Sequence, residues 1–264
     1  KPHAAVGVGG YASGPTLKMA GMMGIPTLIQ EQNSYAGVTN KLLAKKACKI
    51  CVAYDGMERF FEKDKIILTG NPVRQGLRNH HISREEAIRS FGLDPSKKTI
   101  LIVGGSLGAR TINNCVMEGL DKIKASGAQF IWQTGKIYIG EARAAVAQAG
   151  ELPMLHVTDF ISDMAAAYSA ADLIISRAGA GSISEFCLLQ KPVILVPSPN
   201  VAEDHQTKNA LALVNKNAAL YIKDAAAKEA LLDKAVETVK QPETLKSLST
   251  NIAKLAFTDS ANVI

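Results

Sequence analysis

An apolar strand that leads into a glycine-rich loop and then into a helix occurs three times in this sequence. The three copies are AAVGVGGYASGP, ILIVGGSLGART and LIISRAGAGSIS. Each loop is expected to present backbone N–H groups and the positive end of a helix at the carboxyl edge of a sheet, where anions bind. Three such loops predict a ligand that is rich in phosphate, although glycines also serve simply to allow tight turns.

The segments between these loops repeat the same alternation. Apolar runs of strand length, such as PTLIQ, KICVAY, AQFIWQT and PVILVP, are separated by stretches with apolar residues at helical spacing. Strands that are apolar on both faces and alternate with helices predict an α/β fold with parallel sheets covered on both sides. After Ala202 the pattern becomes helical, and no further strand is expected there.

One stretch, GNPVRQGLRNHHISREEA, interrupts the alternation with glycine, proline and charged residues. It predicts a linker over 71–82 that joins an N-terminal domain at 1–70 to a C-terminal domain at 83–264. Ser83 and Glu86 have the capping-box spacing that opens a helix. The terminal helices could pack back on the N-terminal domain.

Composition excludes several classes of function. No apolar stretch reaches the roughly 18 residues that a membrane span needs. The 30 basic residues against 24 acidic ones suit a phosphate-bearing ligand or an anionic membrane surface and are too diffuse to indicate nucleic acid. The densest basic stretch contains Lys41, Lys45, Lys46 and Lys49, which a solvated helix face also explains. Cys48 and Cys51 form a C-x-x-C without a second such pair, so no metal site is predicted.

The first loop also fits a dinucleotide-binding fingerprint. Gly7, Gly9 and Ala12 match G-x-G-x-x-A, and Glu31 ends the next apolar run, where an acid that binds the ribose belongs. Against this, Pro15 suits the first turn of a helix that starts later than the fingerprint requires. The other two loops lack an acid at the end of the following strand.

Six blocks, in this order and spacing, resemble the MurG family of bacterial glycosyltransferases. They are GVGGYASGP, EQNSYAGVTNKLLAK, TGNPVR, VGGSLGAR, TDFISDMAAAYSAADLIISRAGAGSISE and EDHQTKNA, and together they extend over essentially the whole chain. The resemblance implies a GT-B architecture, with two Rossmann-like parallel-sheet domains, a cleft between them and no cofactor. It also implies transfer of N-acetylglucosamine from UDP-GlcNAc to the MurNAc 4-hydroxyl of undecaprenyl-pyrophosphoryl-MurNAc-pentapeptide, which converts lipid I to lipid II in peptidoglycan synthesis. Another GT-B enzyme that uses UDP-GlcNAc, such as a 2-epimerase, and a non-catalytic nucleotide-sugar binding module remain alternatives.

The sequence departs from this family at its beginning. Family members start with a G-G-T-G-G-H loop whose histidine is a candidate catalytic base, and the sequence has no counterpart before AAVGVGG. We therefore expect an incomplete acceptor-binding domain at 1–70, an unknown catalytic base, donor binding, and little or no activity of the chain alone. The resemblance further implies lipid I and an anionic inner-membrane surface as partners, without nucleic acid, at the cytoplasmic face of that membrane.

The resemblance also assigns roles to individual residues. The expected donor-binding residues are Asn33, Arg74, Ser106, Ile161, Ala180, Gly181, Ser182, Glu185 and Gln206, to which Gly105 and His205 are added. Ser106 is expected near the phosphates, the backbone of Ile161 beside the uracil, and Glu185 on the ribose. The amides of Gln206 and Asn33 suit sugar hydroxyls because an amide both donates and accepts. On the acceptor side, Gly9, Gly10 and Tyr11 are expected to face the lipid pyrophosphate.

Overall fold

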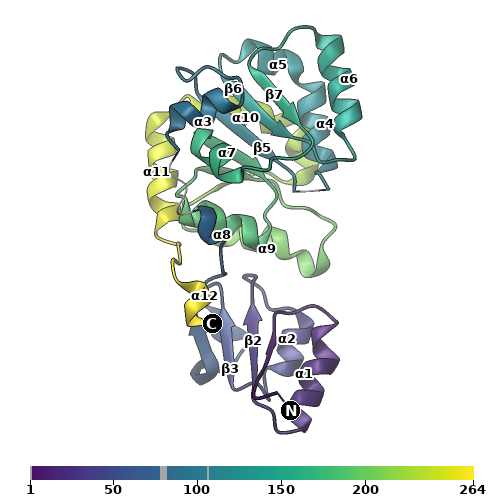
Figure 1. Cartoon of the computed structure of the whole chain (residues 1–264), viewed down its shortest axis with the longest axis vertical. Coiled ribbons are helices and arrows are strands. Elements are labelled where there is room, and N and C mark those ends of the chain that lie inside the picture. The colour runs from purple at the N-terminus through teal and green to yellow at the C-terminus, as the bar shows by residue number, and fades with distance from the viewer. Residues whose placement is uncertain (1, 78–81, 106) are drawn as a thin grey trace.

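The computed structural model describes residues 2–77, 82–105 and 107–264, which form two parallel-sheet domains arranged one above the other along the long axis (Figure 1). The N-terminal domain contains a four-stranded sheet in the order β1-β2-β3-β4. Its elements are β1 (Ala5–Gly7), α1 (Ser13–Met22), β2 (Thr27–Glu31), α2 (Val38–Leu43), β3 (Lys49–Val52) and β4 (Ile66–Leu68), with single turns η1 (Met57–Arg59), η2 (Lys63–Lys65) and η3 (Gln75–Leu77).

The C-terminal domain contains a six-stranded parallel sheet in the order β10-β9-β8-β5-β6-β7. Its strands are β5 (Thr99–Val103), β6 (Gln129–Gln133), β7 (Leu155–Thr158), β8 (Leu173–Ser176), β9 (Val193–Leu195) and β10 (Leu220–Tyr221). Its helices are α3 (Arg84–Ser90), α4 (Arg110–Glu118), α5 (Leu120–Ala125), α6 (Ile139–Ala149), α7 (Met164–Ala170), α8 (Ala180–Leu188), α9 (His205–Val214), α10 (Ala227–Val239), α11 (Pro242–Ala253) and α12 (Ser260–Val263), with turns η4 (Ala202–Asp204) and η5 (Asp224–Ala226).

The central strand β5 explains why this sheet is covered on both faces. All five of its side chains are buried. Leu101 and Val103 pack into one apolar cluster, and Ile100 and Ile102 pack into a second cluster on the opposite face. This division follows from the twofold alternation of side chains along a strand, and it confirms the parallel sheet with two covered faces that the apolar runs predicted.

The carboxyl ends of β5 and β8 lie side by side at the point where the strand order changes direction. Val103, the last residue of β5, is paired with Ser176, the last residue of β8. Strands β6 and β7 follow on one side of this pair, and β9 and β10 on the other. Ligands of open α/β sheets bind at such a switch point. The second and third glycine loops leave the sheet here.

Two local expectations from the sequence can be compared with the structure. The capping box is confirmed, because Ser83 Oγ accepts from Glu86 N at 3.2 Å while Glu86 Oε2 accepts from Ser83 N at 3.1 Å. The expectation of no strand after Ala202 is wrong, since Leu220 and Tyr221 pair with β9. Two residues are too short to produce a periodic pattern, and it is the neighbouring strand that fixes them in the sheet.

The chain crosses between the domains a second time near its end. After α11 it runs from the C-terminal domain toward the four-stranded sheet, where α12 lies (Figure 1). Phe257 packs directly on Gly70, which has a φ of +72°, and a Cβ added to Gly70 would lie 2.4 Å from the Cβ of Phe257. This crossing therefore lies against the start of the segment that joins the two domains.

Candidate functional site

A pocket of about 690 Å³ opens at the carboxyl ends of β5, β8 and β9. The glycine loop after β5, the glycine loop after β8 and the loop after β9 form its walls. Its lining residues include Gly105, Arg110, Gly179, Ser182, Asn200 and Gln206. Four of the predicted donor-site features therefore share one pocket, namely the second loop, the third loop, the start of α8 and the amide of Gln206.

Two helices begin at this pocket, and neither first turn is capped by a side chain within the described part of the chain. Ala109 precedes α4, Gly179 precedes α8, and both line the pocket. The first N–H groups of a helix have no partner inside the helix and carry its positive partial charge. Arg110, an exposed residue in the first turn of α4, adds a full positive charge. The arrangement is suited to a diphosphate.

The glycines of the second and third loops are present for different reasons. A Cβ on Gly108 would lie 2.2 Å from the carbonyl oxygen of Thr134, and its φ is +80°, so the fold itself requires glycine there. A Cβ on Gly179 or Gly181 would meet no atom of the described residues within 4 Å. The third loop therefore leaves open space beside its N–H groups, which lets a ligand approach the backbone closely.

A partly buried ion pair in the lining of the pocket connects the loop after β8 with the loop after β9 and with α4. Arg177 Nη1 pairs with Asp224 Oδ1 and donates to the carbonyl oxygens of Val196 and Pro197 at 3.0 and 3.2 Å. Asp224 Oδ2 accepts from Thr111 Oγ1 at 2.9 Å. The guanidinium of Arg177 is neutralised by this carboxylate, so its role in the structure is to fix the loops.

Gln206 presents only part of its amide to the pocket. Its Oε1 accepts from the backbone N–H groups of Ala178 and Ser198 at 3.1 and 2.9 Å. The amide was expected to offer both a donor and an acceptor to a sugar. Because the acceptor is already engaged, the Nε2 group is the part that is directed to donate.

Asn33 is joined to the C-terminal domain through a residue that sequence reasoning missed. Asn209, which is 0% exposed, donates from Nδ2 to Asn33 Oδ1 at 3.0 Å and accepts at Oδ1 from Ser34 N at 2.9 Å. Its Nδ2 also donates to the carbonyl oxygen of Ala178, at 3.3 Å. Asn209 therefore connects the N-terminal domain with the third glycine loop. Its only sequence signal was its place in the block EDHQTKNA, three residues after Gln206.

Two partners hold the carboxylate of Glu185. Tyr168 Oη donates to its Oε2 at 2.6 Å, and Arg74 Nη2 donates to its Oε1 at 3.2 Å. The predicted residues Arg74 and Glu185 are thus brought together, although one lies after β4 and the other on α8. Burial, together with the nearby Glu185 carboxylate, raises the pKa of Tyr168 well above its usual range, so the tyrosine keeps its proton.

The remaining predicted donor residues lie around this arrangement. Ala180 and Gly181 form the first turn of α8. Ile161 is buried in the apolar core beside α7, so its backbone is the part that could face a base. His205 Nε2 lies 3.0 Å from Glu203 Oε2. Ser106 lies outside the described residues.

The first glycine loop belongs to the other domain and is exposed. Gly9 and Gly10 have φ values of +91° and +77°, and Tyr11 is 91% exposed.

Glu31, the acid of the alternative dinucleotide fingerprint, is buried and accepts from Asn33 N, Asn33 Nδ2, Gly37 N and Asn40 Nδ2 at 2.8–3.4 Å. This carboxylate organises the loop after β2 and is not directed toward a ribose.

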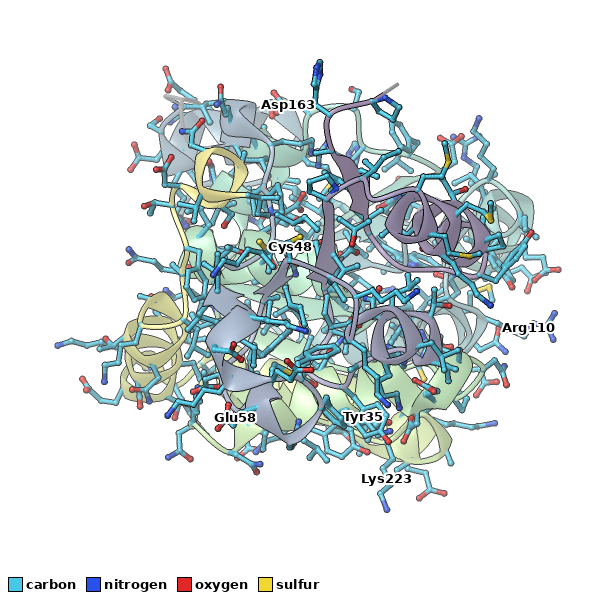
Figure 2. All side chains as sticks on the ribbon, turned by 90° about the horizontal axis from the view of Figure 1, so that it is seen from below. Tyr35, Cys48, Glu58, Arg110, Asp163 and Lys223 are labelled. Atoms are coloured by element: carbon cyan, nitrogen blue, oxygen red, sulfur yellow. The ribbon has the colours of Figure 1, made fainter. Side chains whose placement is uncertain are left out.

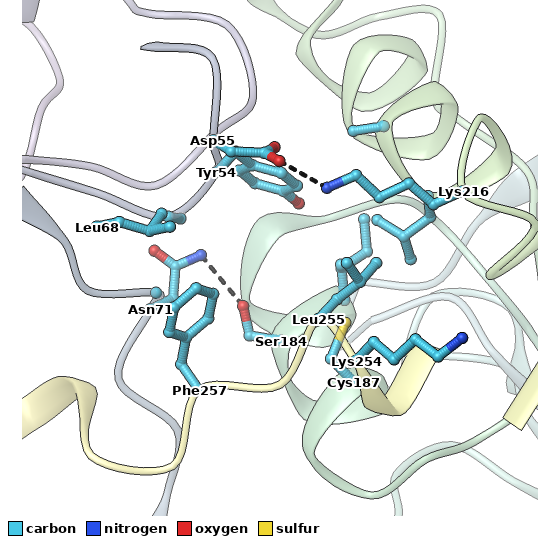
Figure 3. Close-up of a pocket in the computed structure, with 15 residues that line it drawn as sticks. Tyr54, Asp55, Leu68, Asn71, Ser184, Cys187, Lys216, Lys254, Leu255 and Phe257 are labelled. Atoms are coloured by element: carbon cyan, nitrogen blue, oxygen red, sulfur yellow. Dashed lines mark hydrogen bonds and ion pairs between the residues drawn. The ribbon is translucent and has the colours of Figure 1, made fainter. Parts of the chain in front are cut away.

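A second, smaller pocket of about 170 Å³ lies between the domains, and Figure 3 shows its lining. Lys216 pairs with Asp55 across it at 2.9 Å, and Asn71 Nδ2 donates to Ser184 Oγ at 3.2 Å. The apolar part of its wall comes from both domains and includes Leu68, Leu213 and Phe257. Among the described helices that line this pocket, none begins there, so it lacks the helix start that suits a phosphate.

Two α/β domains with a diphosphate-suited pocket at a topological switch point define the class of GT-B nucleotide-sugar enzymes. The model of the glycosyltransferase family 28 C-terminal domain matches residues 99–264, and that of the N-terminal domain matches residues 1–52. The chain belongs to the MurG family within glycosyltransferase family 28. The GT-B architecture expected from the sequence is therefore confirmed.

Several relatives carry the same description. A protein of Bacteroides fragilis is 73% identical over the whole chain, which covers 70% of that relative, and one of Cytophaga hutchinsonii is 53% identical with the same coverage. Both are described as UDP-N-acetylglucosamine--N-acetylmuramyl-(pentapeptide) pyrophosphoryl-undecaprenol N-acetylglucosamine transferase. The crystal structure of MurG from Acinetobacter baumannii matches with a TM-score of 0.79 at 29% identity, over 99% of this chain and 71% of that one.

The UDP-GlcNAc 2-epimerase of Neisseria meningitidis has the same fold. It matches with a TM-score of 0.72 at 15% identity, over 99% of this chain and 75% of that one. At this identity the likeness concerns the fold alone.

Proposed function

We propose that the chain acts as a UDP-GlcNAc-dependent N-acetylglucosaminyltransferase, a hexosyltransferase of peptidoglycan synthesis. The acceptor is undecaprenyl-pyrophosphoryl-MurNAc-pentapeptide, and its MurNAc 4-hydroxyl displaces UDP with inversion at the anomeric carbon. The relatives' shared description supports this substrate pair. The observation on the molecule that carries the proposal is the meeting of two uncapped helix starts at one pocket.

The pocket supports a leaving-group role for these residues. As the bond to the anomeric carbon breaks, negative charge develops on the UDP diphosphate. The N–H groups at the starts of α4 and α8 are already oriented toward the pocket, so they can stabilise that charge without reorganisation. Arg110 strengthens the same field. The group that takes the proton from the MurNAc hydroxyl is not assigned.

Donor binding is the first test of this function. We expect saturable binding of UDP and UDP-GlcNAc by isothermal titration calorimetry, unchanged by EDTA, because the donors in the pocket are N–H groups and side chains. NADH should not compete, since Glu31 is engaged inside the protein. Saturable binding of NADH without binding of UDP would overturn the proposal.

Turnover separates the transferase from its alternatives. With lipid I, a transferase releases UDP, whereas a 2-epimerase converts UDP-GlcNAc without lipid I. We expect the chain to bind the donor and any release of UDP to depend on lipid I. Conversion of UDP-GlcNAc without lipid I would contradict the transferase and favour the epimerase.

The acceptor is a lipid, so we also propose that α1 and α2 contact an anionic membrane at the cytoplasmic face of the inner membrane. The two helices lie side by side on one flank of the N-terminal domain (Figures 1 and 2). Exposed apolar side chains on and around them are Tyr11, Met19, Met22, Met23, Val38 and Leu42. The neighbouring Lys18, Lys45 and Lys46 are exposed as well. Apolar groups beside lysines suit a surface of anionic lipid. No helix in the described residues is long and apolar enough to span a membrane.

Vesicle binding tests this surface. We expect the chain to sediment with phosphatidylglycerol vesicles and much less with phosphatidylcholine vesicles. Replacing Lys45 and Lys46 together by Glu should weaken the binding by at least about tenfold, at ~1 kcal/mol for each lysine lost. The same double change should leave UDP affinity unaltered. Equal binding to both kinds of vesicle would contradict an electrostatic contact.

A further inference from the structure

The hydrogen bond between Tyr168 and Glu185 is short, and its donor is held in place by packing. Its length of 2.6 Å is typical of a hydroxyl that donates to an ionised carboxylate. Tyr168 is buried and its ring packs edge-on against Phe186 at 5.9 Å between centroids, so its hydroxyl has little freedom to move. The Arg74 side chain, by contrast, is 67% exposed. Tyr168 is therefore the partner that fixes the orientation of the carboxylate.

Glu185 lies about one helical turn from a residue that lines the pocket. Ser182 lines the pocket and Glu185 follows it by three residues on the same helix. Residues at this spacing share one face of a helix and are separated by about 4.5 Å along its axis. A ligand whose diphosphate meets the start of α8 therefore extends its next group past Glu185. In a nucleoside diphosphate that group is the ribose.

The hydrogen-bonding capacity of Glu185 matches a diol. An ionised carboxylate offers about four acceptor positions. Tyr168 takes one on Oε2 and Arg74 takes one on Oε1, which leaves about one on each oxygen. Two adjacent acceptors directed the same way suit the neighbouring 2′- and 3′-hydroxyls of a ribose.

We infer that Tyr168 is a positioning residue that orients Glu185 and thereby sets the preference of the site for a ribose over a deoxyribose nucleotide. The inference rests on the proposed function, because it requires UDP in the pocket. The raised pKa of Tyr168 supports it, since the hydroxyl stays a donor throughout the physiological range. Tyr168 acts through Glu185 and makes no contact with the reacting atoms.

The test compares UDP with 2′,3′-dideoxy-UDP by calorimetry on the whole chain. Tyr168→Phe keeps the ring and removes only the hydroxyl. We expect it to weaken UDP binding about tenfold, the effect of losing one charge-assisted hydrogen bond. Affinity for 2′,3′-dideoxy-UDP should change by less than about twofold, because that ligand cannot use Glu185. In a Glu185→Gln background, Tyr168→Phe should have little further effect on UDP binding.

Tyr54→Phe is the matched control, because Tyr54 is a partly buried tyrosine whose buried hydroxyl has no hydrogen-bond partner within the described residues. It should bind both nucleotides as the unchanged chain does. If Tyr168→Phe weakened the binding of both nucleotides equally, Tyr168 would act only in packing and the inference would be overturned. Unchanged affinity for UDP in this variant would overturn it as well. If the unchanged chain bound no UDP, the proposed function itself would fail.

Discussion

Replacing Gly179 by alanine should abolish most donor binding while leaving the fold intact. Gly179 lines the pocket, its φ of −70° suits alanine, and the added Cβ meets no described atom within 4 Å. The methyl group would occupy the space through which a phosphate reaches the start of α8. We expect UDP affinity to fall more than about tenfold, or ~1.4 kcal/mol. The free energy of unfolding should fall by only about 1 kcal/mol or less, the ordinary difference between glycine and alanine before a helix.

Calorimetry with UDP and denaturant unfolding on the same sample provide the two measurements. Gly21→Ala is the control, because Gly21 lies on α1 in the other domain and its added Cβ would make only ordinary contact with Lys46. It should bind UDP normally. If Gly179→Ala bound UDP as tightly as the unchanged chain, the phosphate would not lie at this helix start.

Replacing Asn209 by leucine should weaken the connection between the two domains. Leucine has the same number of side-chain heavy atoms with the same branching, but it removes the partners of Ser34 N and of the Ala178 carbonyl oxygen. A buried polar group without a partner costs about 1–3 kcal/mol, so we expect the free energy of unfolding to fall by about 2–4 kcal/mol. UDP-GlcNAc affinity should fall more than UDP affinity, because Asn209 also positions Asn33, which resembles a sugar-binding residue.

Asn215→Leu provides the comparison, since Asn215 is exposed at the end of the same helix. It should change the free energy of unfolding by less than about 0.5 kcal/mol. Urea unfolding gives the stability, and parallel titrations with UDP and UDP-GlcNAc give the difference in affinity. A loss below about 1 kcal/mol for Asn209→Leu would mean that the domains are joined by other contacts. The interdomain cation–π contact of Lys208 with Tyr35, whose ring centroid lies 3.3 Å from the Lys208 Nζ, would then be the next candidate.

The fold could be predicted because its signals are local. Each glycine loop follows an apolar run and precedes a helix, and that order alone places the loop at the carboxyl edge of a parallel sheet. The capping box at Ser83 and the late start of α1 are equally local. The two-residue strand β10 could not be predicted, because its pairing with β9 depends on the folded sheet.

The site could be predicted only in part, because some of its residues have a local sequence signal and others do not. Gly179 and Ser182 lie in a motif that can be recognised from consecutive residues. Tyr168, Asn209 and Asp224 act through partners on other elements, and nothing in their own neighbourhoods distinguishes them from core or surface residues. Glu31 shows the converse: its spacing suits a ribose, but its hydrogen bonds go to the loop after β2 and to Asn40 on α2.

The packing of Phe257 on Gly70 brings the two connections between the domains together at one place. Two segments of the chain cross between the domains, and they pass side by side at this contact. Two adjacent connections constrain the relative position of the domains more than a single one does, and they act together with the interdomain contacts of Asn209 and Lys216. A side chain at position 70 would push the two segments apart, because its Cβ would lie 2.4 Å from that of Phe257, and we expect this to change the angle at which the two domains meet.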